Sequence, residues 1–323
     1  MTYTSTSKIS YHTIGFYNLE NLFDTENDPN ILDDDFTENS ERNWNKDRYN
    51  KKIEQLGKVI SNIGYKETSN PPVIIGVAEV ENNEVLNDLI ASKHLKNKGY
   101  DFVHFDSPDE RGIDTALLYR ESYFSIVSSE AIPLYINGKF GNRDYTRDIL
   151  YIKGKLKNEI VHLLINHWPS RRSGIEDNSY KRIAAANKNN EIIDAITSED
   201  ANAKIIILGD FNDDPKSESV KTLSEKTMYN PMEMLLTYYS GSLNYRGKWN
   251  LFDQIIISNN FLQQHGNLFR FEKAKIFNPK YLKEFKGKYK GNPLRTFIGK
   301  KYLGGLSDHF PVYSFFSIRN LDS

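Results

Sequence analysis

The segment that most constrains the fold of this chain is AKIIILGDFNDDP, at residues 203–215. Its run of four branched apolar residues, Ile205 to Leu208, predicts a strand that is buried on both faces. Several polar residues follow this strand directly: Asp210, Asn212, Asp213 and Asp214. A carboxylate that follows a buried strand is most often a turn residue, so this segment alone does not define a site. It becomes informative because other strands end in the same way.

Five further predicted strands carry polar residues at one end. Three apolar runs end at a polar residue, as the run Ile205–Leu208 does before Asp210: these residues are Asn18, Glu79 and His167. Two more apolar runs follow a polar residue, namely Asp253 and the pair Asp308–His309. If these last two strands run antiparallel to the others, all of these side chains meet at one rim. Oxygen and imidazole donors suit a hard divalent cation, which predicts Mg²⁺, with Mn²⁺ or Ca²⁺ as alternatives. The chain has no cysteine, which excludes disulfides and thiolate ligands and disfavours zinc.

The wider pattern of the chain predicts one strand-rich domain. Runs of β-branched and aromatic residues between turn clusters predict strands over residues 11–18, 72–80, 114–120, 150–156, 161–167, 204–210, 251–258 and 310–318. Helical spacing of apolar residues predicts helices over about 46–63, 82–94 and 178–197. No linker and no internal repeat interrupts this pattern. We therefore predict a single α+β domain over residues 1–323, with two stacked sheets covered by helices.

Charge and hydropathy bear on location and partners. The net charge of −1 gives no general attraction to nucleic acid or to a membrane surface. No apolar run approaches the roughly 18 residues of a membrane span. The N-terminal segment MTYTSTSKIS lacks the apolar middle of a secretory signal. We expect a cytoplasmic protein, or a secreted or periplasmic one if a leader has been removed. The sequence does not identify a protein partner.

Seven motifs in order carry a resemblance to a known superfamily. They are FYNLENLFD, GVAEVEN, RGIDTALLYR, NHWPSR, LGDFNDDP, LFDQIIIS and GLSDHFPV. Together they resemble the endonuclease/exonuclease/phosphatase superfamily, which includes pancreatic-type deoxyribonucleases, abasic-site endonucleases, sphingomyelinases and inositol-polyphosphate 5-phosphatases. The similarity runs from about residue 12 to residue 318. It implies a four-layer α/β/β/α sandwich of two mixed, mainly antiparallel sheets, and metal-dependent hydrolysis of phosphate esters.

The resemblance also implies roles for the rim residues. The metal would be held by Asn18, Glu79 and Asp308. His309 resembles the general base, and Asp253 resembles the carboxylate that orients it, since an imidazole accepts a proton best when its other nitrogen donates to a fixed acceptor. Asp210 and Asn212 would lie beside the attacking water and the phosphoryl oxygens.

A second histidine and three arginines extend the predicted site. His167 resembles a histidine of the deoxyribonuclease-like branch that contacts the scissile phosphate or protonates the leaving oxygen, with Asp114 as its carboxylate partner. Abasic-site endonucleases lack a histidine there, so the sequence leans away from that subgroup. Arg147 matches a phosphate-contacting arginine, and Arg171 and Arg172 lie close enough to His167 in sequence to bind a flanking phosphate; the alternative for all three is a surface charge.

Two charged runs lie outside these motifs. Residues 24–41 contain eight acids and no Lys or Arg, which predicts either a solvated loop or an additional cation site. Residues 265–301 contain eleven Lys or Arg against two acids, interleaved with Phe and Tyr. This basic segment predicts either a lysine-rich surface with an aromatic inner face or a cationic, stackable surface for nucleic acid beside the rim.

The sequence leaves the substrate open between two classes of enzyme and one class of binding protein. We expect a nuclease that acts on DNA or RNA by in-line water attack, because the second histidine and the basic segment suit a polyanion. The alternative enzyme is a phosphatase or phosphodiesterase for a small-molecule or lipid phosphate ester. A binding module that has lost catalysis is the third hypothesis, but every predicted rim residue is present.

Overall fold

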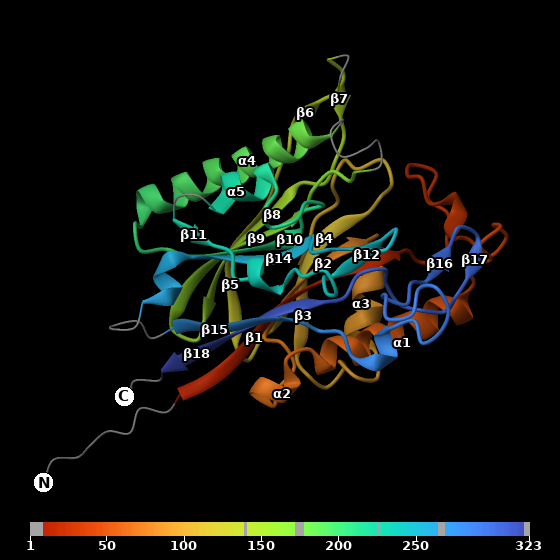
Figure 1. Cartoon of the computed structure of the whole chain (residues 1–323), viewed down its shortest axis with the longest axis horizontal. Helices are drawn as coiled ribbons and strands as arrows, with labels where there is room; N and C mark the ends of the chain where they lie inside the picture. Colours follow the sequence, from red (N-terminus) through yellow and green to blue (C-terminus); the bar gives the residue numbers. More distant parts are fainter. Residues whose placement is uncertain (1–8, 139–140, 172–177, 225–226, 264–268, 320–323) are drawn as a thin grey trace, which may run out of the picture.

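The computed structural model describes residues 9–138, 141–171, 178–224, 227–263 and 269–319. Two six-stranded sheets lie face to face across these ranges (Figure 1). In spatial order the first sheet contains β15 (Phe269–Ile276), β18 (Val312–Arg319), β1 (Ile9–Leu22), β2 (Ile74–Val80), β4 (Asp114–Arg120) and β3 (Tyr100–His104). The second contains β11 (Met228–Tyr229), β14 (Asp253–Ser258), β10 (Lys204–Asp210), β9 (Glu159–His167), β8 (Ile149–Leu156) and β5 (Phe124–Ile132). Only β1–β2 and β9–β10 pair in parallel within these two sheets as described.

Helices cover the outer faces of both sheets (Figure 1). The first sheet is covered by α1 (Lys46–Asn62), α2 (Tyr65–Thr68) and α3 (Asn83–Ala91), and the second by α4 (Ser179–Glu199) and α5 (Glu218–Ser224). The predicted four-layer sandwich of two mixed, mainly antiparallel sheets is therefore confirmed. No helix in the described ranges is long and apolar enough to cross a membrane.

Short elements complete the chain and lie mostly in the connections. Three small hairpins are formed by β6 (Ile136–Asn137) with β7 (Arg143–Asp144), β12 (Leu243–Tyr245) with β13 (Lys248–Asn250), and β16 (Phe297–Ile298) with β17 (Lys301–Tyr302). Single 3₁₀ turns occupy Asp34–Phe36, Glu233–Leu235, Asn259–Leu262 and Lys280–Leu282.

The layers follow from side-chain alternation along the strands. In β10, Ile206 and Leu208 point into the core between the sheets, whereas Ile205 and Ile207 pack toward α4 and α5. Both faces of this strand are buried, which explains its unbroken apolar run. The helix α1 covers the outer face of the first sheet. Asn45 is its N-cap, since the Asn45 side-chain oxygen accepts a hydrogen bond from the Arg48 backbone N–H.

One glycine sets how closely the two sheets approach. A Cβ atom on Gly76, in the middle of β2, would lie 2.4 Å from a methyl carbon of Leu208 in the facing sheet. Real Cβ contacts are not this short, so the local spacing between β2 and β10 requires glycine. Glu79 lies near the end of β2 and Asp210 ends β10, so this close packing brings the two carboxylates to the same edge of the facing sheets.

All eight predicted strands and all three predicted helices are present, with ends shifted by a few residues. The sequence pattern did not predict β3, β5 and β15, which lie on the outside of the sheets. The strand β5 is about half exposed and carries little apolar alternation. The strand β15 lies inside the predicted basic segment, whose composition hid it. Phe269 of this strand is fully buried between the sheets, so this part of the segment has the aromatic inner face that was one alternative.

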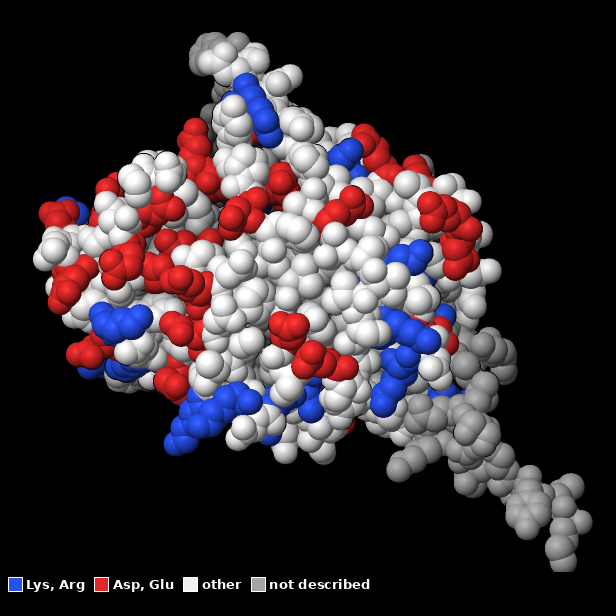
Figure 2. Space-filling model, turned by 180° about the vertical axis from the view of Figure 1, so that it is seen from behind, with Lys and Arg blue, Asp and Glu red and all other residues white. Residues whose placement is uncertain are grey.

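The acidic run at 24–41 forms a loop whose carboxylates hold the backbone. Asp24, Asp28 and Asp33 each accept a hydrogen bond from a nearby backbone N–H. Glu41 pairs with Lys300 of the basic segment. Figure 2 shows acidic side chains gathered on the side of the molecule to which this loop belongs, at the left of that view. These contacts agree with the solvated loop rather than with an additional cation site.

Candidate active site

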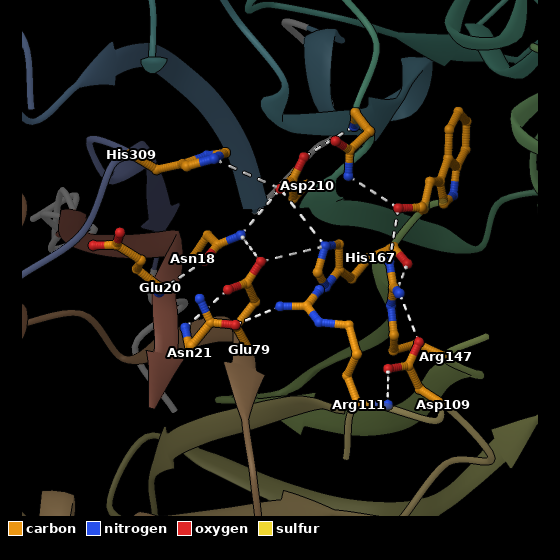
Figure 3. Close-up of polar contacts among 12 residues, drawn as sticks. Asn18, Glu20, Asn21, Glu79, Asp109, Arg111, Arg147, His167, Asp210 and His309 are labelled. Atoms are coloured by element: carbon orange, nitrogen blue, oxygen red, sulfur yellow. Dashed lines mark hydrogen bonds and ion pairs between the residues drawn. The ribbon is translucent and has the colours of Figure 1, made fainter. Parts of the chain in front are cut away.

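The polar strand ends of the sequence analysis meet at one rim. Asp210 stands opposite His167 in the parallel pair β9–β10 and opposite Asp253 in the antiparallel pair β10–β14. Asn18, at the corresponding end of the other sheet, donates from Nδ2 to Asp210 Oδ2 at 3.0 Å. The two sheets are therefore joined at the rim by a buried hydrogen bond, and His309 reaches the same point from the turn before β18 (Figure 3).

The Asp210 carboxylate lies at the centre of this group. Its Oδ2 atom is 3.8 Å from His167 Nε2 and 3.9 Å from His309 Nε2. Both distances exceed the length of a direct hydrogen bond, so neither Nε2 atom is hydrogen-bonded to this carboxylate. Asp210 is 2% exposed, and this burial raises its pKa to about 7, although His309 and Asn18 act in the opposite direction. A cation or a proton is therefore favoured at this position.

His309 and Asp253 form a buried dyad. His309 Nδ1 lies 2.6 Å from Asp253 Oδ2, and the Asp253 side chain is fully buried. Burial lowers the pKa of His309, but the carboxylates of Asp253 and Asp210 outweigh it and raise this pKa well above its usual value. The short contact assigns the proton on Nδ1 to the Asp253 side, which leaves Nε2 facing Asp210 and the open rim.

The turn that carries His309 is fixed to the first sheet by Ser307. The Ser307 hydroxyl donates to the backbone oxygen of Asn18 at 2.6 Å and accepts from the His309 backbone N–H at 3.0 Å. The SDH motif is thereby tied to the end of β1. The position of the imidazole thus depends on a hydrogen bond between segments that lie 289 residues apart.

Asn18 lies in the site, but its oxygen is turned away from the rim. The Oδ1 atom accepts a hydrogen bond from the Glu20 backbone N–H at 2.9 Å. Because a backbone N–H can only donate, the atom opposite it must be the oxygen, and the amide nitrogen then faces Glu79 at 3.3 Å and Asp210 at 3.0 Å. In this geometry Asn18 holds two carboxylates together, and its role as a metal ligand stays a prediction.

Strained backbone is concentrated at the same place. Within the described ranges, four of the eight non-glycine residues with positive φ belong to the rim: Glu20, Asn21, Glu79 and Asn212. Such conformations are costly for residues with side chains and persist where surrounding contacts enforce them. At Glu79, the enforcing contacts are bonds to both carboxylate oxygens, from Asn18 Nδ2 and from the Asn21 backbone N–H at 2.8 Å. The pairing register of β1 with β2 also shifts here.

An arginine of the basic segment reaches the rim. Arg295 contacts Glu20 Oε1 at 3.1 Å and Asp308 Oδ2 at 3.0 Å, and Glu20 Oε2 also accepts from the Thr296 backbone N–H at 2.6 Å. Although Arg295 and the Thr296 N–H lower the pKa of Glu20, burial and the nearby Asp308 carboxylate outweigh them and raise it to about 7. The basic segment therefore borders the site directly, and the guanidinium shields two of its carboxylates from one another.

The predicted pairing of His167 with Asp114 is not the pairing that the structure gives. Asp114 Oδ2 lies 3.4 Å from His104 Nε2, and its Oδ1 accepts from the Ser107 backbone N–H at 3.1 Å. The carboxylates of Glu79 and Asp210 instead lie near His167 Nε2, at 3.9 Å and 3.8 Å. Asp114 lies on β4, next to β2 and in the other sheet from His167, and there it meets the adjacent edge strand β3.

Arg147 is buried behind His167 and is not exposed to the rim. Its guanidinium donates to the backbone oxygens of His167 at 3.2 Å and Trp168 at 2.9 Å, and it forms an ion pair with Asp109 at 2.8 Å. At 7% exposure, three of its five N–H groups are engaged in holding the end of β9. These bonds let Arg147 position His167, and its contact with a phosphate stays a prediction.

Arg171 likewise braces the loop after β10. It donates to the backbone oxygen of Asn212 at 2.7 Å and pairs with Asp213, which also binds the buried Arg182 at 2.7 Å. Asn212 donates from Nδ2 to the Trp168 backbone oxygen at 2.9 Å. These bonds fix the GDFN turn against the end of β9. Arg172 falls outside the described residues.

Sequence reasoning missed four residues of the site: Glu20, Asn21, Arg111 and Arg295. The first three lie inside the motifs that carried the superfamily resemblance, at positions to which no role was assigned. Arg111 donates to Asn21 Oδ1, and Figure 3 shows its guanidinium directed toward Glu79 and His167. Its place in the RGIDT motif was the available signal. Arg295 carried no signal of its own because it is one of eleven basic residues in its segment.

The donor set at the rim fits a hard divalent cation. Glu79, Asp210 and Asp308 supply carboxylate oxygens, and the buried Asp210, Asp253 and His309 also bring ligand atoms within 4.8 Å of one another. Burial, and secondarily the neighbouring Asp253 carboxylate, raises the pKa of Asp210, so a positive charge beside Asp210 would be favourable. A divalent ion would supply this charge, and oxygen donors are those that Mg²⁺, Mn²⁺ and Ca²⁺ prefer.

The fold and the rim define the class of protein. A four-layer sandwich whose facing sheets bring carboxylates and two imidazoles to one edge has the architecture of the deoxyribonuclease-like phosphoester hydrolases. The family model described as Endonuclease/Exonuclease/phosphatase family matches residues 13–318, so the chain belongs to this family. Members of the family are phosphoester hydrolases that depend on a divalent metal. The resemblance given in the sequence analysis is confirmed.

Solved structures show the same fold at low sequence identity. An endonuclease/exonuclease/phosphatase family protein from Bacteroides thetaiotaomicron is 17% identical, with a TM-score of 0.58 and 97% of each chain covered. Truncated TDP2 from Caenorhabditis elegans is 14% identical, with a TM-score of 0.58, over 95% of this chain and 97% of that one. A mannosyl-6-phosphatase from B. thetaiotaomicron is 17% identical, with a TM-score of 0.56, over 94% and 99%. A search of curated proteins finds no significant match.

Proposed function

We propose that this protein is a divalent-metal-dependent phosphodiesterase, and that it acts as a nuclease on DNA or RNA. The observation that carries the proposal is the position of Asp210 Oδ2 between the Nε2 atoms of two histidines, at 3.8 Å and 3.9 Å. Hydrolysis of a diester requires a proton to leave the attacking water and a proton to reach the leaving oxygen. Two imidazoles that face one carboxylate, one from the end of β9 and one from the turn before β18, can perform these two transfers.

In this proposal the two histidines have different roles in proton transfer. A cation at Asp210 would offset part of the negative charge that raises the pKa of His309. In its neutral form, His309 accepts the proton of the attacking water at Nε2, and Asp253 stabilises the resulting imidazolium through the 2.6 Å contact at Nδ1. His167 Nε2 donates a proton to the leaving oxygen, while Arg147 holds its backbone in place. Arg111, a half-buried cation directed at the rim, is suited to bind a phosphoryl oxygen.

The metal site in this proposal consists of Glu79, Asp210 and Asp308, with Asn18 as the residue that holds the first two in position. Mg²⁺ is the ion we propose, with Mn²⁺ and Ca²⁺ as alternatives. A bound ion of this kind neutralises phosphate charge and stabilises the leaving oxygen.

A phosphatase for a small phosphate ester remains the second candidate, because a monoester presents the same phosphoryl group to the same rim. One solved structure with this fold is a mannosyl-6-phosphatase, which supports keeping this candidate. The nuclease is favoured by the basic segment, since Arg295 places it in contact with the site.

The test is an activity panel with a catalytic variant. Supercoiled plasmid, single-stranded DNA, RNA and a set of phosphomonoesters are incubated with the protein in Mg²⁺, Mn²⁺, Ca²⁺ or EDTA. We expect metal-dependent cleavage of a nucleic acid that is lost in His309→Ala, with substrate binding retained, and is kept in the control His94→Ala, which replaces a histidine beyond the end of α3. Cleavage in EDTA after thorough metal removal would refute the metal-dependent mechanism. Turnover of monoesters alone would refute the proposal that the substrate is a nucleic acid.

A further inference from the structure

A cavity with a volume of about 570 Å³ opens beside the rim. One wall is the β12–β13 hairpin with its turn at Arg246 and Gly247, and the other is the part of the basic segment between Glu284 and Ile298. Asp308 and Arg295 line the cavity and also belong to the rim. The cavity therefore continues the candidate active site. Its volume lies within the range of about 300–1,000 Å³ that is typical of small-ligand sites.

The lining combines exposed aromatic rings with cations. Tyr245 is 61% exposed and Tyr289 is 48% exposed, one on each wall. Each ring carries a neighbouring cation: Arg246 lies 5.1 Å from the Tyr245 ring, and Lys288 lies 5.7 Å from the Tyr289 ring. Aromatic faces next to Lys and Arg are the surface that binds single-stranded nucleic acid, because bases stack on the rings while phosphates pair with the cations.

Both walls are built by internal hydrogen bonds. On the basic side, the Glu284 N–H donates to the Asn292 oxygen at 2.8 Å, and the Gly291 N–H donates to the Glu284 oxygen at 2.8 Å. On the other side, the Gly247 N–H donates to Asn244 Oδ1 at 3.0 Å and closes the hairpin turn. The tyrosines are thus carried by two loops whose backbones are closed by hydrogen bonds.

We propose that this cavity is a nucleotide subsite, which takes the nucleotide next to the scissile phosphate of a single-stranded nucleic acid. This inference rests on the proposed function and deepens it. The base of that nucleotide stacks on Tyr245 or Tyr289, and the flanking phosphate pairs with Arg246 or Lys288. A duplex keeps its bases stacked on one another, so the subsite favours single strands over double strands.

The experiment compares a long substrate with a minimal one. Tyr245→Ala/Tyr289→Ala and Arg246→Gln/Lys288→Gln double variants are assayed on a single-stranded 12-nucleotide DNA, on a sugar phosphate and on a minimal ester. The minimal ester is methyl p-nitrophenyl phosphate, which carries neither a base nor a flanking phosphate. Controls are Tyr65→Ala and Lys66→Gln. These are exposed residues of α2, which meets β1 at Thr13, upstream of the rim residue Asn18.

The two variants are expected to change different quantities. Loss of stacking on one base raises KM for the oligonucleotide at least about fivefold in the tyrosine variant. The cation variant reduces the slope of log Kd against log salt by about 0.7 for each phosphate that the protein no longer neutralises. Hydrolysis of the minimal ester stays within twofold of wild type in both, and the α2 controls change neither substrate.

The outcomes separate the subsite from the function on which it rests. If wild type cleaves the oligonucleotide and both variants keep its KM and salt slope, the subsite is wrong and the nuclease proposal stands. If the variants instead raise KM for a sugar phosphate and not for the oligonucleotide, the cavity binds a different class of substrate and the subsite is wrong. If wild type hydrolyses only the minimal ester, the nuclease proposal fails and the subsite fails with it.

Discussion

Replacing Asp253 by asparagine tests the proposed dyad most directly. The change keeps the shape of a fully buried side chain that lies 2.6 Å from His309 Nδ1 and removes its charge. An asparagine oxygen can still accept the Nδ1–H bond, so the imidazole stays in place, but the imidazolium formed during proton transfer loses its partner. No water can replace this carboxylate, because its side chain has no exposed surface.

The expected loss follows from the role of the dyad. General acid–base catalysis contributes about 10²–10⁴ in rate, which corresponds to about 3–5 kcal/mol of transition-state stabilisation. We expect the kcat of Asp253→Asn to be lower than that of wild type by a factor within this range. KM should change little, because Asp253 does not face the substrate. His309→Ala should lose a similar factor, and the double variant should lose scarcely more than either single one, since the two residues act as a unit.

The assay is steady-state hydrolysis of bis(p-nitrophenyl) phosphate with saturating metal, with thermal unfolding to show that each variant is folded. Asp101→Asn is the matched control: this aspartate accepts a hydrogen bond from Tyr119 at 3.0 Å, at the end of β4 away from the rim, and its loss should leave kcat unchanged. Retention of more than a tenth of wild-type kcat in Asp253→Asn, or multiplicative losses in the double variant, would refute the reasoning.

Three further perturbations have defined outcomes. Glu79→Gln should raise the Mg²⁺ concentration needed for half-maximal activity at least about tenfold, measured by metal titration after EDTA treatment; an unchanged titration would remove Glu79 from the metal site. Burial and the nearby Lys157 and Arg120 lower the pKa of His12 from 6.5 to about 4. As the pH drops, the unfolded chain therefore binds a proton at His12 before the folded chain does. The free energy of unfolding falls below pH 6.5, by up to about 3 kcal/mol once pH 4 is passed. Urea unfolding at pH 7.5 and pH 4.5 should show a smaller loss in His12→Gln than in wild type, and equal losses would contradict this assignment. Gly76→Val should cost about 1–3 kcal/mol in the same unfolding experiment, because the new side chain collides with the facing sheet, and a neutral result would show that the sheets can separate.

The central strands could be predicted from sequence because burial on both faces leaves an unambiguous signal. Ile205 to Leu208 form a continuous apolar run for this reason, and the polar residue that ends each such run marks the rim. Edge strands carry no such signal: β5 is half exposed, and the charges of Lys273 and Lys275 on β15 resemble those of a loop. Tertiary pairing, rather than local preference, makes these segments strands.

The composition of the site was predictable, but the directions of its polar groups were not. A motif shows that Asn18 is near the rim, whereas only the Glu20 N–H shows which end of its amide faces the carboxylates. In the same way, the motifs marked Arg147 and Arg171 as candidates, but the hydrogen bonds of these arginines to backbone oxygens depend on how the loops close. Hydrogen-bond direction is a property of the assembled neighbours, and the sequence does not contain it locally.

The tie between Ser307 and Asn18 has a consequence for how activity arises during folding. The first sheet can pair β1 with β2 early, but one side of β1 stays open until β18 docks, and the segment that precedes β18 carries Asp308 and His309. Closing so long a loop is slow, so we expect the imidazole to arrive at the rim last. A chain interrupted at this step would have Glu79 and Asp210 in place but neither Asp308 nor His309, and would therefore lack hydrolytic capacity. Pulse-labelled hydrogen exchange can test this order, since amides of β9 and β10 should become protected before those of β18.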